Sequence, residues 1–219
     1  TSDPKGVVIS HGNLASNALA FQVAAEHDHL SVMASWLPMF HDMGLIGGIL
    51  QPLYVGFLGI LMAPIRFLAN PAAWLQAITE FNVTSTGGPN FGYEHCLRKI
   101  SKEQLSVCDL SSWKTAFNGA EPIRYDTLVR FSEKFATCGF NKRAFFPVYG
   151  LAEATLYAAG GPPLKSWPIP CKKTSVHESH IQHNAQRFVS NGQIACNAVV
   201  RIVEPETLLP LDDGIEGEI

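Results

Sequence analysis

The chain has 219 residues, of which 47% are hydrophobic and 16% are charged, and its formal net charge is -3. This composition is typical of a soluble globular protein, and the length allows one large domain or two small ones around a sizeable core. The absence of a basic excess argues against a nucleic-acid-binding protein. The five cysteines are widely spaced and form no Cys-x-x-Cys pair, which favours reduced thiols in a cytoplasmic protein over a disulfide framework.

Strand and helix patterns alternate along residues 1–160. Short β-branched or apolar runs predict strands at residues 6–10, 30–37, 58–63, 83–86, 114–117 and 144–148. Apolar residues at helical spacing predict helices at residues 11–28, 71–81, 90–100 and 124–135, with Asn13 as the N-cap of the first. The alternation predicts an α/β fold of mostly parallel strands with helices on both faces.

The stretch from Met43 to Ile65 contains no charged residue and is long enough to span a bilayer. However, Gln51-Pro52 lies in its middle, and glycines interrupt it at positions 44, 47, 48, 56 and 59. A buried helix, a turn and a buried strand explain this pattern better than a transmembrane segment does. We therefore expect no transmembrane segment here.

The pattern changes after residue 160. Residues 161–187 contain clustered prolines and three histidines with little periodicity, which predicts an irregular insertion. Cys171 and these histidines form only a weak zinc pattern, and a solvated polar loop is the preferred interpretation. Residues 188–219 predict the start of a small β-rich portion after the α/β core of residues 1–160. The sequence starts inside a polar turn and stops as a strand begins, so we expect a piece of a longer protein.

The common nucleotide-binding and hydrolase signatures are absent from the sequence. There is no GxxxxGK phosphate loop, no GxGxxG after a strand and no GxSxG nucleophile elbow. These absences argue against a P-loop ATPase, a Rossmann dehydrogenase and an α/β-hydrolase.

Polar or glycine-rich turns instead follow several predicted strands. Residues 145–155 predict a strand, a turn at Tyr149-Gly150 and a helix start, which places an aromatic ring and the Glu153 carboxylate near exposed backbone. Residues 1–6 offer hydroxyls, a lysine and a glycine to phosphates, and His41 stands beside Asp42 before an apolar helix. Residues 87–90 and 118–122 let a ligand approach the backbone closely. Each turn alone is also explained by a surface turn, a helix cap or a core histidine.

Together, these segments resemble the adenylate-forming superfamily. Residues 1–6 are similar to the end of its phosphate loop, and Tyr149-Gly150-Leu151-Ala152-Glu153 resembles its Tyr-Gly-x-x-Glu motif. Within the superfamily, residues 35–48, 87–91, 117–122 and 149–155 are most similar to the fatty acyl-AMP ligases. The resemblance covers nearly the whole chain, with its blocks in the family's order.

The resemblance implies that ATP and Mg²⁺ activate a fatty acid to an acyl-adenylate, which is passed to an acyl carrier protein or to a polyketide or peptide synthase. It implies catalytic roles for His41 at the carboxylate entrance, for Lys5 in the phosphate loop and for Glu153 as the Mg²⁺ ligand. It implies an acyl tunnel bordered by Gly88, Asn90 and Phe91. The residues it assigns to the nucleotide are Thr1, Ser2, Asn118, Gly119, Ala120, Glu121, Pro122, Tyr149, Gly150, Leu151 and Ala152.

Two departures from the wider superfamily are Ala152 in place of Thr and Ser2 in place of Gly, and both fit the acyl-AMP ligase branch. The segment of residues 161–187 lies where that branch carries an insertion thought to hinder the use of coenzyme A. Motifs expected after Ile219 are missing, so we expect little or no complete activity from this piece alone. The alternatives are a long-chain fatty acyl-CoA synthetase and a non-catalytic acyl- or nucleotide-binding module.

Overall fold

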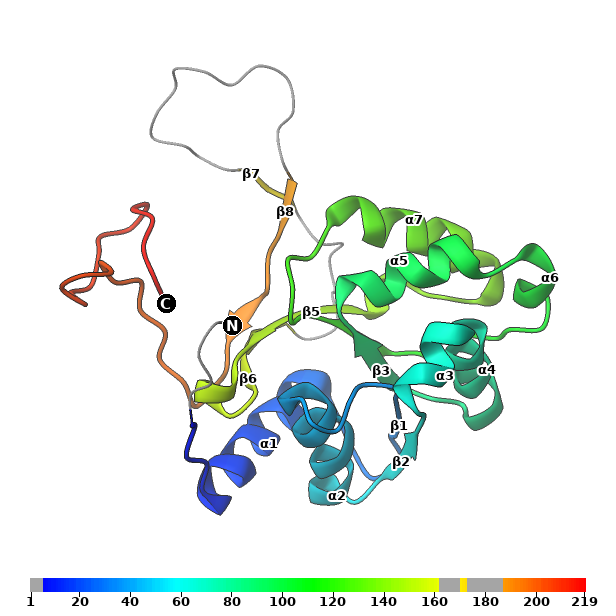
Figure 1. Cartoon of the computed structure of the whole chain (residues 1–219), viewed down its shortest axis with the longest axis horizontal. Helices are drawn as coiled ribbons and strands as arrows, with labels where there is room; N and C mark the ends of the chain where they lie inside the picture. The colour runs from blue at the N-terminus through cyan, green and yellow to red at the C-terminus, as the bar shows by residue number, and fades with distance from the viewer. Residues whose placement is uncertain (1–5, 162–169, 173–186) are drawn as a thin grey trace.

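The computed structural model describes residues 6–161, 170–172 and 187–219, and a seven-stranded sheet lies at its centre (Figure 1). The strand order is β2-β1-β3-β4-β5-β6-β9, with β2 to β5 parallel and β6 and β9 antiparallel. The strands are β1 (Val32–Ser35), β2 (Leu58–Leu61), β3 (Ser85–Gly88), β4 (Thr115–Asn118), β5 (Phe145–Gly150), β6 (Tyr157–Gly160) and β9 (Gln193–Ile194). The predicted mostly parallel sheet is confirmed.

Helices cover both faces of this sheet, as predicted (Figure 1). On one face lie α1 (His11–Ala25) and α2 (Gln51–Val55), the latter preceded by a π-helix, η1 (Met43–Leu50). On the other side lie α3 (Pro64–Ala69), α4 (Ala72–Phe81), α5 (Asn90–Lys99), α6 (Lys102–Leu105) and α7 (Tyr125–Phe135). The 3₁₀ turns are η2 (Ala136–Cys138), η3 (Lys142–Ala144) and η4 (Ala152–Ala154). The sequence did not predict α3 or α6, which are short.

Strand β5 contributes side chains to the hydrophobic core on both faces of the sheet. Its successive residues Phe145 and Phe146 point to opposite faces, as the period of a strand requires. Phe145 packs against Tyr93 and Phe131, with ring centroids 5.6 and 6.0 Å away, whereas Phe146 lies 6.3 Å from Phe21. Both β5 rings are completely buried. Burying such a side chain stabilises the fold by about 1.5–3 kcal/mol, so this strand is firmly anchored on both sides.

The entry into α1 differs from the prediction. Residues 6–10 form no strand, and Val8 is 96% exposed, because no neighbouring strand pairs with this segment among the described residues. Ser10, not Asn13, is the N-cap: its Oγ accepts from the Asn13 N–H at 3.1 Å, and Asn13 Oδ1 accepts from the Ser10 N–H at 3.0 Å. This is a capping box, in which two otherwise orphaned amides are satisfied reciprocally.

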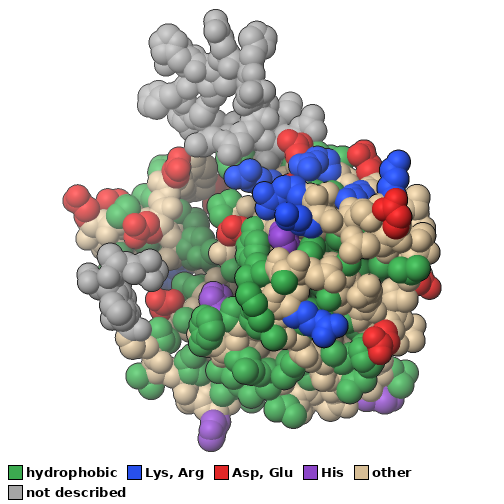
Figure 2. Space-filling model, turned by 45° about the vertical axis from the view of Figure 1, so that its right-hand side comes forward, with side chains coloured by type: hydrophobic (Ala, Val, Ile, Leu, Met, Phe, Trp, Pro, Cys, Tyr) green, Lys and Arg blue, Asp and Glu red, His purple; other side chains and the backbone are tan. Residues whose placement is uncertain are grey.

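The uncharged stretch from Met43 to Ile65 is broken, as predicted, into helix, turn and strand. The expectation of a buried strand is wrong, however, because β2 lies at the sheet edge and Leu58 and Leu61 are each 57% exposed. Figure 2 shows hydrophobic side chains gathered over the lower part of one face. None of the helices in the described part of the chain combines the length and the apolarity needed to cross a bilayer.

The segment after Gly150 also departs from the prediction. The expected helix of residues 151–155 is only the short turn η4, after which the chain reverses into β6. The reversal occurs at Thr155, whose φ of 71° and ψ of -58° are accompanied by a 2.9 Å hydrogen bond from the Leu156 N–H to the Ala154 carbonyl. This is a γ-turn of the rare, strained kind, and it prevents the helix from continuing.

The C-terminal segments only partly follow the prediction. In the predicted β-rich portion, residues 198–203 form no continuous strand, and Val203 forms isolated bridges to Pro210 and Glu218. Within the predicted irregular insertion, β7 (Pro170–Lys172) pairs with β8 (Arg187–Val189) in a separate two-stranded sheet. The histidines of the weak zinc pattern lie outside the described residues.

Candidate functional site

The loops that follow β1, β4 and β5 meet at one edge of the sheet. Parallel strands place their carboxyl ends on the same side, which is where open α/β sheets bind ligands. A cavity of about 220 Å³ opens there. Its lining comprises Phe21, His41, Asp42, Met43, Gly47, Phe117, Ala120, Val148, Tyr149, Gly150, Leu151, Leu156 and Tyr157. The structure thus brings His41, Ala120 and Tyr149-Gly150-Leu151 together, although they are far apart in the sequence.

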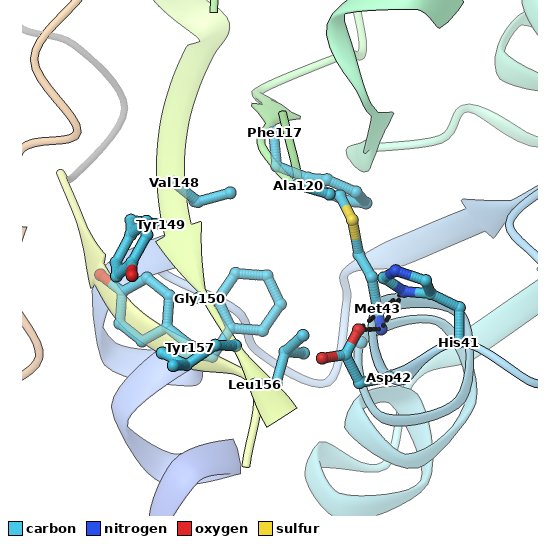
Figure 3. Close-up of a pocket in the computed structure, with 13 residues that line it drawn as sticks. His41, Asp42, Met43, Phe117, Ala120, Val148, Tyr149, Gly150, Leu156 and Tyr157 are labelled. Atoms are coloured by element: carbon cyan, nitrogen blue, oxygen red, sulfur yellow. Dashed lines mark hydrogen bonds and ion pairs between the residues drawn. The ribbon is translucent and has the colours of Figure 1, made fainter. Parts of the chain in front are cut away.

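Figure 3 shows His41 and Asp42 on one side of this cavity and Tyr149 and Tyr157 on the other. His41 Nδ1 lies 2.7 Å from Asp42 Oδ1, which also accepts from the Met43 N–H at 2.6 Å. The Met43 N–H also donates to His41 Nδ1 at 3.2 Å, so this amide is shared between the carboxylate and the imidazole. Asp42 therefore both begins η1 and orients the imidazole, leaving Nε2 as the ring atom that can meet a ligand.

The β5–β6 corner forms the opposite wall. A Cβ atom at Gly150 would clash with the carbonyl oxygen of Leu156, because the two chain segments touch through their backbones. The same carbonyl accepts the Leu151 N–H at 3.1 Å, so this amide is engaged within the fold. Burial, and to a lesser degree Cys196, raises the pKa of Tyr157 to about 12, which keeps its phenol neutral. This wall is therefore aromatic and uncharged.

The end of β4 carries an unusual amide. Asn118 is completely buried, and neither its side-chain oxygen nor its nitrogen has a hydrogen-bond partner among the described residues. Such an unsatisfied polar group costs about 1–3 kcal/mol. Asn118 lies outside the cavity lining. Two residues later, Ala120 has a left-handed φ of 64°, which is uncommon for a residue with a Cβ atom. Backbone strain of this kind clusters at functional sites.

The remaining residues predicted from β3 and β4 lie beside the cavity rather than in its lining. Gly87 and Gly88, expected in a turn, are the last residues of β3, and Gly88 packs directly against the Trp36 indole. Phe91 lies 5.8 Å from the same indole, edge to face. Asn90 Oδ1 accepts from the Arg124 N–H at 3.0 Å. These contacts form an apolar wall at the start of α5.

Glu121 joins this wall to the loop after β4, since its Oε1 accepts from the Phe91 N–H at 2.6 Å. Gly119 lies beside Val148, a lining residue, so a Cβ atom at position 119 would crowd that side chain. Pro122 and Ala152 do not line the cavity. Thr1, Ser2 and Lys5 lie outside the described residues.

Glu153 borders a second cavity, of about 210 Å³, which shares Tyr157 with the first. Its side chain is exposed. No three His, Cys, Asp or Glu side chains gather into a metal cluster in the parts of the chain that the structure describes. One accessible carboxylate nevertheless suits Mg²⁺, which in nucleotide sites keeps several waters and is bound by one or two carboxylates together with substrate phosphates. Glu153 therefore fits such an ion.

Several lining residues were not predicted as part of the site. Phe21 comes from the apolar face of α1. Tyr157 is the first residue of β6, the strand that follows the γ-turn and that the sequence did not predict. The others are Phe117, Val148 and Leu156. An apolar residue on a helix or strand looks the same in a sequence whether it lines a core or a cavity, so no local signal marked them.

Comparisons with known proteins show which family the chain resembles. A family model described as AMP-binding enzyme matches residues 1–219. The chain is 42% identical to the medium-chain-fatty-acid–acyl-carrier-protein ligase TtuA of Teredinibacter turnerae, over all of this chain and 35% of that protein. It is 36% identical to the 4-hydroxyphenylalkanoate adenylyltransferase of Mycobacterium tuberculosis, over all of this chain and 37% of that protein. The chain thus spans little more than a third of the relatives it matches.

Solved structures of related enzymes are also similar to this chain. The fatty acyl-adenylate ligase from L. pneumophila, in complex with acyl adenylate and pyrophosphate, superposes with a TM-score of 0.86 at 42% identity. The match covers 95% of this chain and 38% of that one. The adenylation domain of a keto acid-selecting NRPS module, at 23% identity and a TM-score of 0.84, shares the fold.

Proposed function

Because the chain belongs to the AMP-binding enzyme family, we propose that it is the part of a ligase in which a fatty acid is activated to its acyl-adenylate. The observation that carries this proposal is the cavity where His41, Ala120 and Tyr149 converge from three separate loops. The relatives named as fatty-acid ligases, TtuA among them, support the substrate class. The chain alone spans too little of these relatives to be equated with the whole enzyme.

In this proposal, the adenine of ATP lies between Tyr149 and the loop that contains Ala120, next to Asn118 and Gly119 at the end of β4. An aromatic ring and bare backbone suit a flat base, because they bury both of its faces without steric conflict. The glycines at positions 119 and 150 let the chain approach closely. The site thus favours a nucleotide held by shape and stacking.

The reaction joins two negatively charged groups, the fatty carboxylate and the α-phosphate. Mg²⁺ bound at Glu153 would screen the phosphate charge. His41, oriented by Asp42, would meet the incoming carboxylate through Nε2 and would thereby fix its position. Holding both groups in line converts a bimolecular encounter into an intramolecular step. Lys5, Thr1 and Ser2 would hold the terminal phosphates.

The fatty tail would extend along the apolar wall near Met43, Gly88, Asn90 and Phe91, where Trp36 and Phe67 stack with ring centroids 3.9 Å apart. We further propose an acyl carrier protein, or a polyketide or peptide synthase, as the acceptor, since TtuA and JamA are named as acyl-carrier-protein ligases. The described cysteines Cys96, Cys108, Cys138 and Cys196 are free thiols, in keeping with a proposed cytoplasmic location.

The test uses the intact protein that contains this chain, supplied with Mg-ATP and fatty acids of graded length. We expect pyrophosphate release that depends on the fatty acid, and acyl transfer to a carrier protein in preference to coenzyme A. Glu153→Gln should abolish the Mg²⁺-dependent step while leaving fatty-acid binding intact. Release that is independent of any fatty acid would refute the proposed activity.

A further inference from the structure

The side chain of Asn17, on α1, reaches across to the turn that carries Glu153. Its Nδ2 donates to the carbonyl of Tyr157 at 2.8 Å and to the carbonyl of Ala154 at 3.2 Å. Its Oδ1 accepts from the Tyr157 N–H at 3.0 Å. Asn17 is 8% exposed. One buried amide thus satisfies backbone groups on both sides of the γ-turn, and neither the motifs nor the cavity lining of the main site includes it.

The turn held in this way is strained. Thr155 is its central residue, and its φ of 71° is rare for any residue with a Cβ atom and rarer still for a β-branched one. Such a conformation is unfavourable and persists only where the surroundings impose it. The three hydrogen bonds of Asn17 hold it from α1, in addition to the hydrogen bond from the Leu151 N–H to the Leu156 carbonyl. Without them, η4 is free to relax toward a longer helix, and Glu153 would move with it.

The second cavity places Asn17 and Glu153 in the same lining. We propose that Asn17 is a positioning residue, which fixes the Glu153 carboxylate for Mg²⁺ by clamping the γ-turn between Ala154 and Tyr157. This inference rests on the proposed function, because that function supplies the metal role of Glu153. Mutation of a residue that orients a metal ligand without binding the metal itself typically lowers metal affinity by about 10–100-fold, so the effect is measurable.

The experiment compares the wild-type intact protein with Asn17→Ala in two measurements. The first is the Mg²⁺ concentration for half-maximal pyrophosphate release, which should rise by about tenfold or more while the KM for the fatty acid changes by less than about twofold. The second needs no activity: hydrogen exchange should quicken at the amides of Leu156 and Tyr157. Unchanged exchange overturns the clamp, and faster exchange with an unchanged Mg²⁺ requirement overturns the positioning role.

Gln51→Ala provides a matched control. Gln51, the first residue of α2, also has a buried amide that binds α1: its Nε2 donates to the Ala18 carbonyl at 3.2 Å. Among the described residues, no hydrogen bond joins it to the Glu153 turn. Its loss should lower the unfolding temperature without altering the Mg²⁺ requirement. An equal shift in both variants would show a general loss of stability and would overturn the inference.

Thr155→Gly provides the second test. Glycine adopts a positive φ without strain, so the turn should need Asn17 less. The effect of Asn17→Ala on the Mg²⁺ requirement should therefore be smaller in the Thr155→Gly background, and an undiminished effect would contradict the clamp. If Asn17→Ala does not fold, Asn17→Asp, which keeps the acceptor and loses both donated bonds, decides by the same two measurements. If wild type shows no fatty-acid-dependent release, the proposed function fails, and the exchange data alone decide whether Asn17 holds the turn.

Discussion

The backbone N–H of Phe91 donates a 2.6 Å hydrogen bond to Glu121 Oε1. Phe91 is the second residue of α5, where the first amides have no partner within the helix. A carboxylate at this end is also favoured by the helix dipole. Glu121 belongs to the loop after β4, so this bond fixes that loop to the helix that begins the apolar wall. Two proposed binding regions are thereby coupled through one side chain.

Replacing Glu121 should therefore affect both stability and nucleotide binding. Glu121→Ala removes the acceptor and should cost about 1 kcal/mol in the free energy of unfolding, as the loss of a helix cap does. The KM for ATP should rise in the same variant, because the loop that contains Ala120 is released. Glu121→Gln keeps an acceptor and should lose less on both counts. Urea unfolding and steady-state kinetics of the intact protein measure these effects, and identical behaviour of the two variants would contradict the coupling.

The Tyr149 ring should contribute to nucleotide affinity by stacking. Aromatic stacking on a base is worth about 1–3 kcal/mol on substitution by alanine, so Tyr149→Ala should raise the KM for ATP by about tenfold or more. Tyr149→Phe keeps the ring and should stay close to wild type. Steady-state kinetics with varied ATP distinguish the two. A Phe variant as impaired as the Ala variant would mean that the hydroxyl, and not the ring, makes the contact.

Much of the sheet could be predicted because its signals are local. Strands β1, β3, β4 and β5 are short apolar or small-residue runs followed by turns, and their order along the chain predicts parallel pairing. The strands at the edges of the sheet were harder to predict, because the burial of a strand depends on neighbours that are distant in the sequence. Strand β2 is as apolar as a buried strand, yet it pairs on one side only. The γ-turn at Thr155 was unpredictable in the same sense, since the side chain that holds it lies on α1.

Some residues of the candidate site could likewise be predicted from local sequence signals, and others could not. Turns rich in glycine or polar residues, such as Tyr149-Gly150 and His41-Asp42, are visible in a sequence because they interrupt an apolar pattern. The cavity's apolar lining, including Phe21 and Tyr157, looks like core. Asn17 was missed for another reason: a lone asparagine in a helix has no pattern, and only the structure shows what its amide contacts.

The buried His27 should make the stability of the protein depend on pH. Its Nε2 lies 2.9 Å from Ser85 Oγ and its ring lies 5.2 Å from both Phe21 and Phe57, so burial lowers its pKa from 6.5 to about 4, despite the opposing effect of Asp28. Between these values the unfolded chain takes up a proton and the folded chain does not. Stability is therefore complete above about pH 6.5 and is lost as the pH falls toward 4.

The loss between pH 7 and pH 5 should be about 2 kcal/mol for this one group, since a full unit of pKa shift corresponds to about 1.4 kcal/mol. His27→Gln, which cannot take up the proton, should show a flatter profile. His29→Gln, at an exposed position two residues away, should keep the wild-type slope. Urea unfolding of the intact protein at several pH values measures the difference. A slope that survives in His27→Gln would assign the pH dependence to other groups.

Gly150 should tolerate no side chain, because a Cβ atom there would clash with the Leu156 carbonyl oxygen, which is backbone and cannot rotate away. Gly150→Ala should therefore push β6 from β5, lower the unfolding temperature and abolish fatty-acid-dependent pyrophosphate release. Gly12→Ala is the matched control: its nearest contact is Ser10 Oγ at 3.6 Å, and alanine in a helix is favoured over glycine by about 0.5–1 kcal/mol. That variant should be as stable as wild type or slightly more so, with unchanged activity. Full activity in Gly150→Ala would show that the β5–β6 contact can open without disturbing the site, and it would separate this corner from catalysis.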